Sequence, residues 1–325
     1  MISELLDRAT PFSVSLNTPF RGVVKRIGFA FEGQYGFGEW APFSDYAPNL
    51  SAKWLAAALL AADEPRNQNL RKQVACNGIV PALDPKAAVD WALKLYQDLG
   101  VKTLKVKVGD PLDVERVKAI QEALPDLNLR VDANGAWSLD QARVKIRELV
   151  DFNVSVIEQP CTTLSDCAQV RGLGADIAID EGIRLSHQLD DTFIAQIRDA
   201  ADLVVLKPIP LGGLQQTKVI AKRINLPVII SGSLDTSIGL SYVAYVAACM
   251  PTEPLASGLG TGVLLANDLT NQTLLPRNGF IEISDTQVSQ SLLENARSRV
   301  SKSEQADLIE RLTQTVAELA NQSEL

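Results

Sequence analysis

The chain has 325 residues, enough for one large barrel or two ordinary domains, and its 46% hydrophobic and 22% charged content is that of a globular protein. A net charge of −8 without any basic run argues against a nucleic-acid-binding surface. The first residues lack the basic and apolar regions of a signal peptide, and no apolar run approaches the ~18 residues of a membrane span. The four cysteines form no Cys-x-x-Cys pair, so we expect a soluble cytoplasmic protein with reduced thiols.

Residues 1–73 are predicted to form an α+β domain. The segments 11–16, 22–33 and 35–40 are strand-like, and we expect them to pair as an antiparallel meander. A helical pattern over 49–65 follows them.

From residue 74 to about 270 the sequence alternates short apolar runs with amphipathic helical patterns. Several helical patterns open with Asp-Pro or Ser, which are common residues at a helix N-terminus. Such alternation is typical of βαβ units, so eight strands with seven helices predict a (β/α)7β TIM-like barrel, with a doubly wound sheet as the alternative. The eight predicted strands are 74–80, 103–109, 129–135, 154–160, 176–182, 203–208, 227–233 and 253–260.

Both ends of the chain lie outside this barrel. Residues 279–284 are strand-like, and 302–320 show an amphipathic helical pattern. We therefore expect three parts: an N-terminal α+β domain over 1–73, the barrel with the active site over 74–270, and a C-terminal segment over 271–325. The C-terminal segment is expected to return to the N-terminal domain and to complete an α+β capping domain.

Charged residues recur at the carboxyl ends of five consecutive barrel strands, which is where barrel enzymes carry their catalytic groups. Each charge follows the previous one by about one βα unit. Glu158 shares a strand face with Val156, and Asp180 shares one with Ala178, because side chains alternate along a strand. A solvated edge or a helix cap explains one such charge, but not five in phase. In chain order they are Lys105 and Lys107, Asp132, Glu158, Asp180 and Lys207.

The three carboxylates predict a metal site. If Asp132, Glu158 and Asp180 point into the barrel they converge, and like charges in a dry site require a cation. Oxygen ligands without histidine are those that Mg2+ prefers, with positions left open for water or substrate. The second and sixth strands are opposite in an eight-strand ring, so Lys107 and Lys207 are expected to face each other across that metal.

These residues resemble the motifs of the enolase superfamily, in particular those of its muconate-lactonizing subgroup. The subgroup has Lys-x-Lys, Asp-x-Asn, Glu-Gln-Pro, Asp-Glu and Lys-Pro in order, and this chain has KVK, DAN, EQP, DE and KP. The resemblance covers nearly the whole chain and implies a TIM-like barrel with a capping domain made from both termini. It implies one Mg2+ on the three carboxylates, with Mn2+ as a substitute, Lys107 as the acid/base and Lys207 as the opposing lysine.

Neighbouring residues are expected to support this chemistry. The ordinary pKa of lysine, near 10.4, is too high for a base at neutral pH, and a dication and a second ammonium both favour neutral lysine. We therefore expect Lys105 to tune or position Lys107, and Arg130, on the face of Asp132, to add to this effect. Glu181 alternates to the other strand face, which places it behind the metal ligands.

Within the subgroup, the sequence most resembles the o-succinylbenzoate synthase family, through PFRGVVKRIG, GFGEWAPFSDY and LRVDANGAW. This likeness implies a carbon–oxygen lyase of menaquinone biosynthesis that removes water from 2-succinyl-6-hydroxy-2,4-cyclohexadiene-1-carboxylate through an ene-diolate. A small-molecule carboxylate is then the expected partner, with no nucleic acid, no membrane and no particular oligomeric state indicated. Family members contact the succinyl group with the seventh strand end and the loop after the eighth, which here contain Ser231, Gly232, Ser233 and Gly258. Gly232 departs from the serine run that relatives often carry.

Other functions fit part of the pattern. An N-acylamino acid racemase or dipeptide epimerase would use the same metal and both lysines, and a muconate cycloisomerase is less favoured. An aldolase with Lys207 as a Schiff-base lysine and a non-catalytic binding barrel belong to other classes; three carboxylates beside the lysine argue against the aldolase. His187 is interpreted as a surface residue. Trp40, Phe43 and Tyr46 are interpreted either as a flap over the barrel mouth or as packing within the capping domain.

Overall fold

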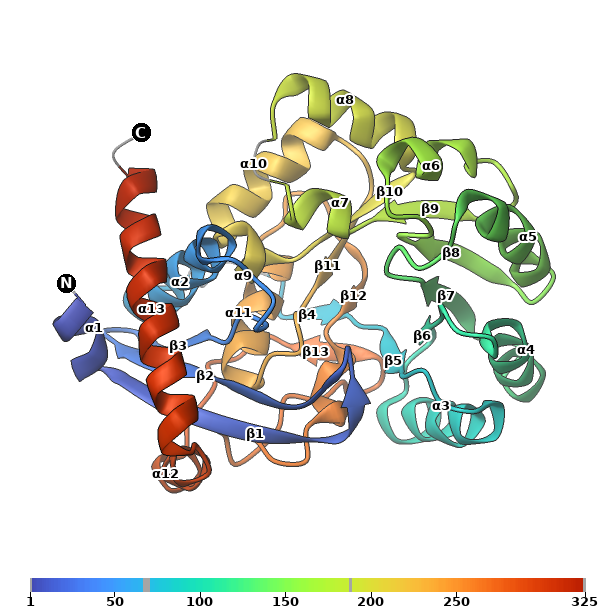
Figure 1. Cartoon of the computed structure of the whole chain (residues 1–325). Coiled ribbons are helices and arrows are strands. Elements are labelled where there is room, and N and C mark those ends of the chain that lie inside the picture. The colour runs from blue at the N-terminus through green and yellow to red at the C-terminus, as the bar shows by residue number, and fades with distance from the viewer. Residues whose placement is uncertain (1, 67–70, 187–188, 324–325) are drawn as a thin grey trace.

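The computed structural model describes residues 2–66, 71–186 and 189–323, and Figure 1 shows a parallel barrel with an α+β domain packed against it. His187 lies outside the described residues. Among the described helices, none combines the length and the hydropathy that crossing a bilayer requires.

The N-terminal part is built on an antiparallel meander. After α1 (Ile2–Asp7), the strands β1 (Ala9–Phe20), β2 (Val23–Gly33) and β3 (Gly36–Trp40) pair in that order. Helix α2 (Pro48–Asp63) packs on β3. A Cβ at Gly38 would lie 1.8 Å from the carbonyl oxygen of Ala58, so glycine is what allows strand and helix to approach so closely.

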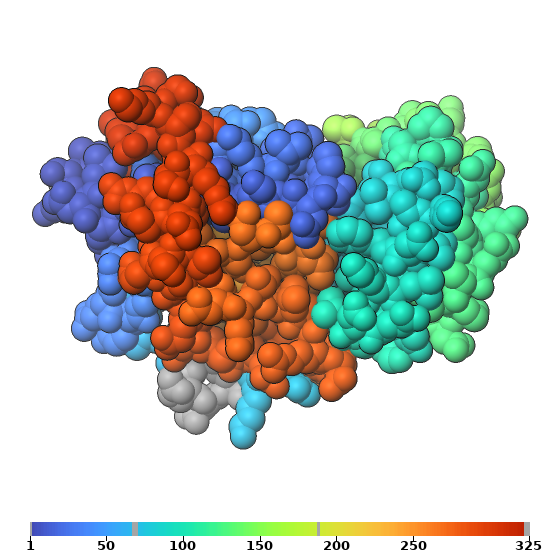
Figure 2. All heavy atoms as spheres, turned by 90° about the horizontal axis from the view of Figure 1, so that it is seen from below, coloured from blue at the N-terminus to red at the C-terminus, as the bar shows by residue number. Residues whose placement is uncertain are grey.

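The C-terminal helices complete this domain. Helix α12 (Gln290–Ser298) packs on β1, and α13 (Lys302–Ser323) packs on α2. Figure 2 shows the red atoms of the C-terminal segment directly against the blue atoms of the N-terminal one. The prediction that both ends form one α+β domain is confirmed, and the unit made of β1–β3, α2, α12 and α13 is called the capping domain below.

In the described residues, eight strands form one parallel sheet in chain order, from β5 to β12. An isolated bridge between Cys76 and Ser257 joins its two edges, and each connection between consecutive strands contains a helix, so the (β/α)7β barrel is confirmed. The strands are β5 (Gly78–Val80), β6 (Thr103–Lys107), β7 (Asn128–Asp132), β8 (Val154–Glu158), β9 (Asp176–Ile179), β10 (Leu203–Leu206), β11 (Val228–Ser231) and β12 (Leu255–Gly258). The helices are α3 (Pro85–Leu99), α4 (Asp113–Ala123), α5 (Leu139–Val150), α6 (Leu164–Gln169), α7 (Glu181–Arg184), α8 (Asp191–Ala200), α9 (Pro208–Leu211), α10 (Leu214–Ile224) and α11 (Ser237–Ala248), and the 3-10 helix η1 (Gly260–Leu264) follows β12.

The first predicted barrel strand, 74–80, is two strands. Its start, β4 (Gln73–Ala75), pairs antiparallel with β13 (Phe280–Glu282), and only β5 joins the barrel. The backbone changes its hydrogen-bonding partner between β4 and β5. Cys76 N–H donates to the carbonyl of Gly279, next to β13, whereas Asn77 N–H donates to the carbonyl of Ser257, on β12. The strand predicted over 279–284 therefore pairs beside the barrel and not with the sheet of the capping domain.

The strand register brings the charged residues to one height. Lys107 is paired with Asp132, and Asp132 with Glu158, across three neighbouring strands. Two positions before Glu158, Asp180 and Lys207 stand Val156, Ala178 and Val205, which are buried together in the barrel interior, so these three charged residues point inward at its rim. The buried interior cluster consists of Val156, Ala178, Leu203, Val205 and Ile229.

Candidate active site

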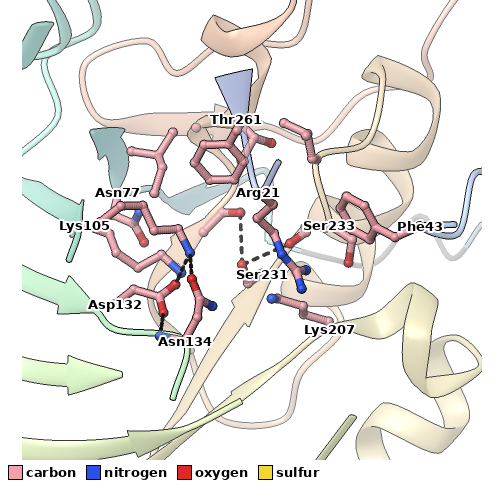
Figure 3. Close-up of a pocket in the computed structure, with 17 residues that line it drawn as sticks. Arg21, Phe43, Asn77, Lys105, Asp132, Asn134, Lys207, Ser231, Ser233 and Thr261 are labelled. Atoms are coloured by element: carbon pink, nitrogen blue, oxygen red, sulfur yellow. Dashed lines mark hydrogen bonds and ion pairs between the residues drawn. The ribbon is translucent and has the colours of Figure 1, made fainter. Parts of the chain in front are cut away.

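The carboxyl ends of the barrel strands and the capping domain enclose a cleft. The space among its lining atoms is about 490 Å3, including the part open to solvent. Figure 3 shows Lys105, Asp132 and Asn134 on one side of this cleft and Lys207 on the other. The strands β6 and β7 supply the first side and β10 the second, so the cleft lies between charges that the sequence separates widely.

Lys105 joins two carboxylates from neighbouring strands. Its ammonium donates to Asp132 Oδ2 at 3.1 Å and to Glu158 Oε2 at 3.0 Å, and all three side chains are buried. Burial acts to lower the pKa of Lys105, but Glu158, Asp132 and Asp180 outweigh it and raise the pKa. Lys105 is therefore a permanent cation in this arrangement.

Lys107 borders the cleft and is held by two oxygens. Its ammonium donates to Asp132 Oδ2 at 2.6 Å and to Asn134 Oδ1 at 2.7 Å. Burial lowers the pKa of Lys107, and the positive charge of Lys105 adds to this, although Asp132 and Glu158 oppose it. A lowered pKa is what a lysine needs to act as a base near neutral pH.

Lys207 occupies the opposite side. Its ammonium donates to Asp180 Oδ2 at 2.6 Å, and Asp180 Oδ1 accepts from Nε of Arg184 at 3.0 Å. Burial acts to raise the pKa of Asp180, but Arg184 and Lys207 outweigh it and lower the pKa to about 2. Asp180 is thus ionised and has both oxygens engaged.

The donor set fits a hard divalent cation in its chemistry. Asp132, Glu158 and Asp180 offer oxygens alone, as Mg2+ prefers, and burial together with the like charge of Asp132 raises the pKa of Glu158 to about 7. A dication would oppose that rise. In the described ranges, no three acidic, histidine or cysteine side chains are arranged around one metal position. The carboxylates are instead paired with ammonium groups: Lys105 with Asp132 and Glu158, and Lys207 with Asp180.

Two further predicted residues lie beside this centre. Arg130 Nη1 donates to the carbonyl of Ala256 across the barrel at 2.8 Å, and its buried Nε has no partner among the described residues. Glu181 Oε1 accepts from Asn134 Nδ2 at 2.9 Å and from Arg184 Nη2 at 2.6 Å. Glu181 thus connects the residue that holds Lys107 to the residue that holds Asp180.

The predicted substrate wall lies along the cleft. Ser231, Gly232, Ser233 and Gly258 all line it, at the ends of β11 and β12. Ser231 Oγ donates to the carbonyl of Gly232 at 3.2 Å. A Cβ at Gly258 would lie 2.4 Å from Ser231 Oγ, so only glycine at this position leaves room for the serine hydroxyl.

Sequence reasoning missed several residues of the cleft. Asn134, within the DAN motif, contacts Lys107, and the motif itself was the signal that pointed to it. Arg21 enters from the β1–β2 turn, where Arg21 and Gly22 both have positive φ, and Figure 3 shows its guanidinium beside Ser231 and Lys207. A hairpin tip carries no local signal of which distant surface it meets. The other lining residues that had no assignment are Phe20, Asn77, Ile79, Leu234, Gly260 and Thr261.

The aromatic segment of the capping domain is packed. Trp40, Phe43 and Tyr46 are all buried, and the rings of Phe43 and Tyr46 contact Trp54 with centroids 6.3 and 5.8 Å apart. Phe43 also lines the cleft. These rings therefore fit the interpretation that they pack within the capping domain, and the Phe43 ring also contributes to the lining of the cleft.

Comparison with protein families gives two matches. Residues 87–287 match the family described as Enolase C-terminal domain-like, and residues 12–62 match Enolase N-terminal domain-like. The chain is 38% identical over 289 residues to an o-succinylbenzoate synthase of Thermobifida fusca (strain YX), which covers 87% of this chain and 89% of that relative. It is 37% identical over 287 residues to an o-succinylbenzoate synthase of Mycobacterium ulcerans (strain Agy99), covering 86% and 85%.

Solved structures share the fold at low sequence identity. A muconate lactonizing enzyme from Pseudomonas fluorescens complexed with muconolactone has a TM-score of 0.74 at 18% identity, covering 89% of this chain and 97% of that one. A dipeptide epimerase from Enterococcus faecalis V583, complexed with Mg and the dipeptide L-Leu-L-Tyr, has a TM-score of 0.70 at 20% identity, covering 86% and 97%.

Proposed function

Because the chain belongs to the o-succinylbenzoate synthase family of the enolase superfamily, we propose that it dehydrates 2-succinyl-6-hydroxy-2,4-cyclohexadiene-1-carboxylate to o-succinylbenzoate, as a lyase of menaquinone biosynthesis. The family resemblance of the sequence is confirmed by these relatives. The observation that carries the proposal is a pair of lysines lining one cleft: Lys107 is hydrogen-bonded to Asp132 on one side, and Lys207 lies on the other.

We assign proton transfer to Lys107. Its pKa is lowered by burial, and its Nζ lies between Asp132 and Asn134, which orient it toward the cleft. In its neutral form it takes the proton α to the substrate carboxylate, breaking the C–H bond. It then returns that proton to the departing hydroxyl on the same face, so the C–O bond breaks and one water leaves.

We assign a fixed electrostatic role to Lys207. Its ammonium borders the cleft on the side opposite Lys107, where it would stabilise the negative charge that develops on the substrate. Asp132, Glu158 and Asp180 would hold Mg2+, with Mn2+ as a substitute, once the lysine contacts to them are released. When bound, such an ion stabilises negative charge on carboxylate oxygens.

The wall formed by Ser231, Gly232, Ser233 and Gly258 is assigned to the succinyl group. It offers the Ser231 hydroxyl, for which Gly258 leaves room, and such a small polar wall suits a flexible carboxylate-bearing chain. Arg21, at the hairpin tip beside this wall, adds a positive charge for that carboxylate.

The direct test is formation of o-succinylbenzoate by the purified protein, with Mg2+, with Mn2+ and with a chelator. We expect turnover with either ion and its loss with the chelator. An inactive, folded protein that binds Mg2+ would refute the dehydratase assignment. Exclusive racemisation of N-acylamino acids or dipeptides would favour the second candidate, which the placement of both lysines on the cleft also supports.

A further inference from the structure

Two buried charged residues of the capping domain contact the barrel behind the substrate wall. Glu39 on β3 is 2% exposed and Arg26 on β2 is 3% exposed, and neither lines the cleft. Both contact the chain just after β11, which is the segment that forms the wall.

Glu39 holds the N-terminus of α11. Its carboxylate accepts from Thr236 N–H at 3.0 Å, from the Thr236 hydroxyl at 2.5 Å and from Gly239 N–H at 3.0 Å. Thr236 is the N-cap of α11, so a carboxylate from another domain pairs with amides that a helix N-terminus leaves unpaired. A Cβ at Gly239 would lie 3.0 Å from Glu39 Oε2, so glycine keeps this contact open.

Arg26 holds the preceding turn. Its Nε donates to the carbonyl of Leu234 at 3.1 Å, its Nη2 donates to the carbonyl of Ala41, and its guanidinium lies 4.1 Å from the centre of the Phe43 ring. Leu234 has a φ of 64°, a strained conformation for leucine, and it lines the cleft. The arginine thus holds one strained residue that lines the cleft, Leu234, and contacts one aromatic residue that lines it, Phe43.

The charges of this cluster depend on each other. Asp235 accepts from Ser233 N–H at 2.7 Å through Oδ2, while its buried Oδ1 has no partner among the described residues. The positive charge of Arg26 interacts electrostatically with both Asp235 and Glu39, and that of Lys207 with Asp235. Removing one member therefore disturbs the others and, through Ser233 and Leu234, the wall itself.

We propose that Glu39 and Arg26 are positioning residues through which the capping domain sets the shape of the wall Ser231–Leu234, and so the affinity for the substrate end that lies there. The inference rests on the proposed function in taking this cleft as the substrate site. It predicts an effect on substrate binding more than on the chemical step, because neither residue touches the reacting groups.

The test uses Glu39→Gln and Arg26→Met in the full-length protein. The matched control is Asp63→Asn, which removes the charge of Asp63 and one of the two oxygens that accept from Arg8 at 2.7 Å. We expect both test variants to raise KM about tenfold, because a hydrogen bond to a charged group is lost, with kcat changed less than about threefold. Mg2+ affinity is expected to stay at the wild-type value, and the control is expected to leave KM unchanged.

A second readout needs no turnover. Amide hydrogen exchange over residues 232–240 is expected to be faster in both test variants and unchanged in Asp63→Asn. If a test variant does not fold, Gly239→Ala disturbs the same contact from the barrel side and is judged by the same criteria. The proposal is overturned if kcat falls while KM stays, or if exchange over 232–240 matches the wild type. Absent dehydratase activity in the wild type refutes the proposed function instead, and the exchange measurement still decides the coupling.

Discussion

The ammonium group of Lys207 and the carboxylate of Asp180 form a 2.6 Å hydrogen bond at the ends of neighbouring strands β10 and β9. Asp180 is held from its other side by Arg184, so the pair is fixed relative to the barrel. Lys207 is therefore a positioned positive charge across the cleft from Lys107. Whether it also moves a proton separates a one-base dehydration from a two-base racemisation.

Replacing Lys207 by arginine is expected to retain measurable dehydration and to abolish racemisation. Arginine keeps the positive charge but is not deprotonated in a protein, and racemisation requires a second base. The measurements are o-succinylbenzoate formation and racemisation of an N-acylamino acid. Lys107→Arg, as the control, is expected to lose both. A folded, Mg2+-binding Lys207→Arg variant as inactive as Lys207→Ala, with a structure that excludes steric blocking, would show that Lys207 transfers a proton.

Replacing Lys107 by alanine is expected to remove exchange of the substrate α-proton with deuterated solvent. Replacing Lys105 by alanine is expected to slow the reaction and to move the rising limb of the pH–rate profile to higher pH. The sign follows from the charge: Lys105 lowers the pKa of Lys107, so its removal raises that pKa. If the Lys107 variant still exchanged the α-proton and the Lys105 variant did not, Lys105 would be the base and Lys107 the supporting residue.

Asp132→Asn, Glu158→Gln and Asp180→Asn are each expected to lower turnover by at least about 100-fold and to weaken Mg2+ binding, because one ligand charge is lost. Calorimetric titration with Mg2+ separates the loss of the ion from misfolding. Asp176→Asn, at the opposite end of β9, makes the same charge change away from the site and is the control. Wild-type activity of any of the three at limiting Mg2+ would remove that residue from the ligand set.

Arg116 is expected to stabilise the rim around Lys107. It is 1% exposed, and its guanidinium donates to the carbonyls of Leu83 and Lys107 and to the carboxylate of Asp110. Arg116→Met is expected to lower the free energy of unfolding by about 3 kcal/mol, because buried acceptors lose their donors. Arg143→Met, at a half-buried residue of α5, is expected to change the free energy of unfolding by less than about 0.5 kcal/mol. Equal denaturation midpoints for the two variants would contradict this.

Glu39 is expected to make stability depend on pH. Burial, with the like charge of Asp235 adding to it, raises the pKa of Glu39 to about 7 from the ordinary 4.5. The folded state therefore holds this proton more tightly, and the stabilisation present below pH 4.5 is lost as pH rises through 7. Unfolding free energies across this window should fall more steeply in the wild type than in Glu39→Gln, by up to ~1.4 kcal/mol per pH unit. Parallel slopes would show that Glu39 is ionised throughout; Arg26 is the cation that opposes the shift.

The barrel and the common height of its charged residues follow from local patterns in the sequence. Alternating apolar runs and amphipathic helices require parallel strands, and parallel strands place their carboxyl ends at one rim. Lys107, Asp132 and Glu158 therefore had to meet once the strands paired in order, and register pairs them directly. The same periodicity predicted that Asp180 and Lys207 point inward.

Local patterns do not specify which charged residues touch or which segments close the cleft; the tertiary structure does. It placed Lys105 between Asp132 and Glu158, and it split the strand predicted over 74–80 because partners far along the chain compete for its backbone. Glu39 and Thr236 lie 197 residues apart, and their contact forms when two domains dock. Local periodicity records which face of an element is buried; it carries no record of the partner, because that choice depends on the packing of the whole chain.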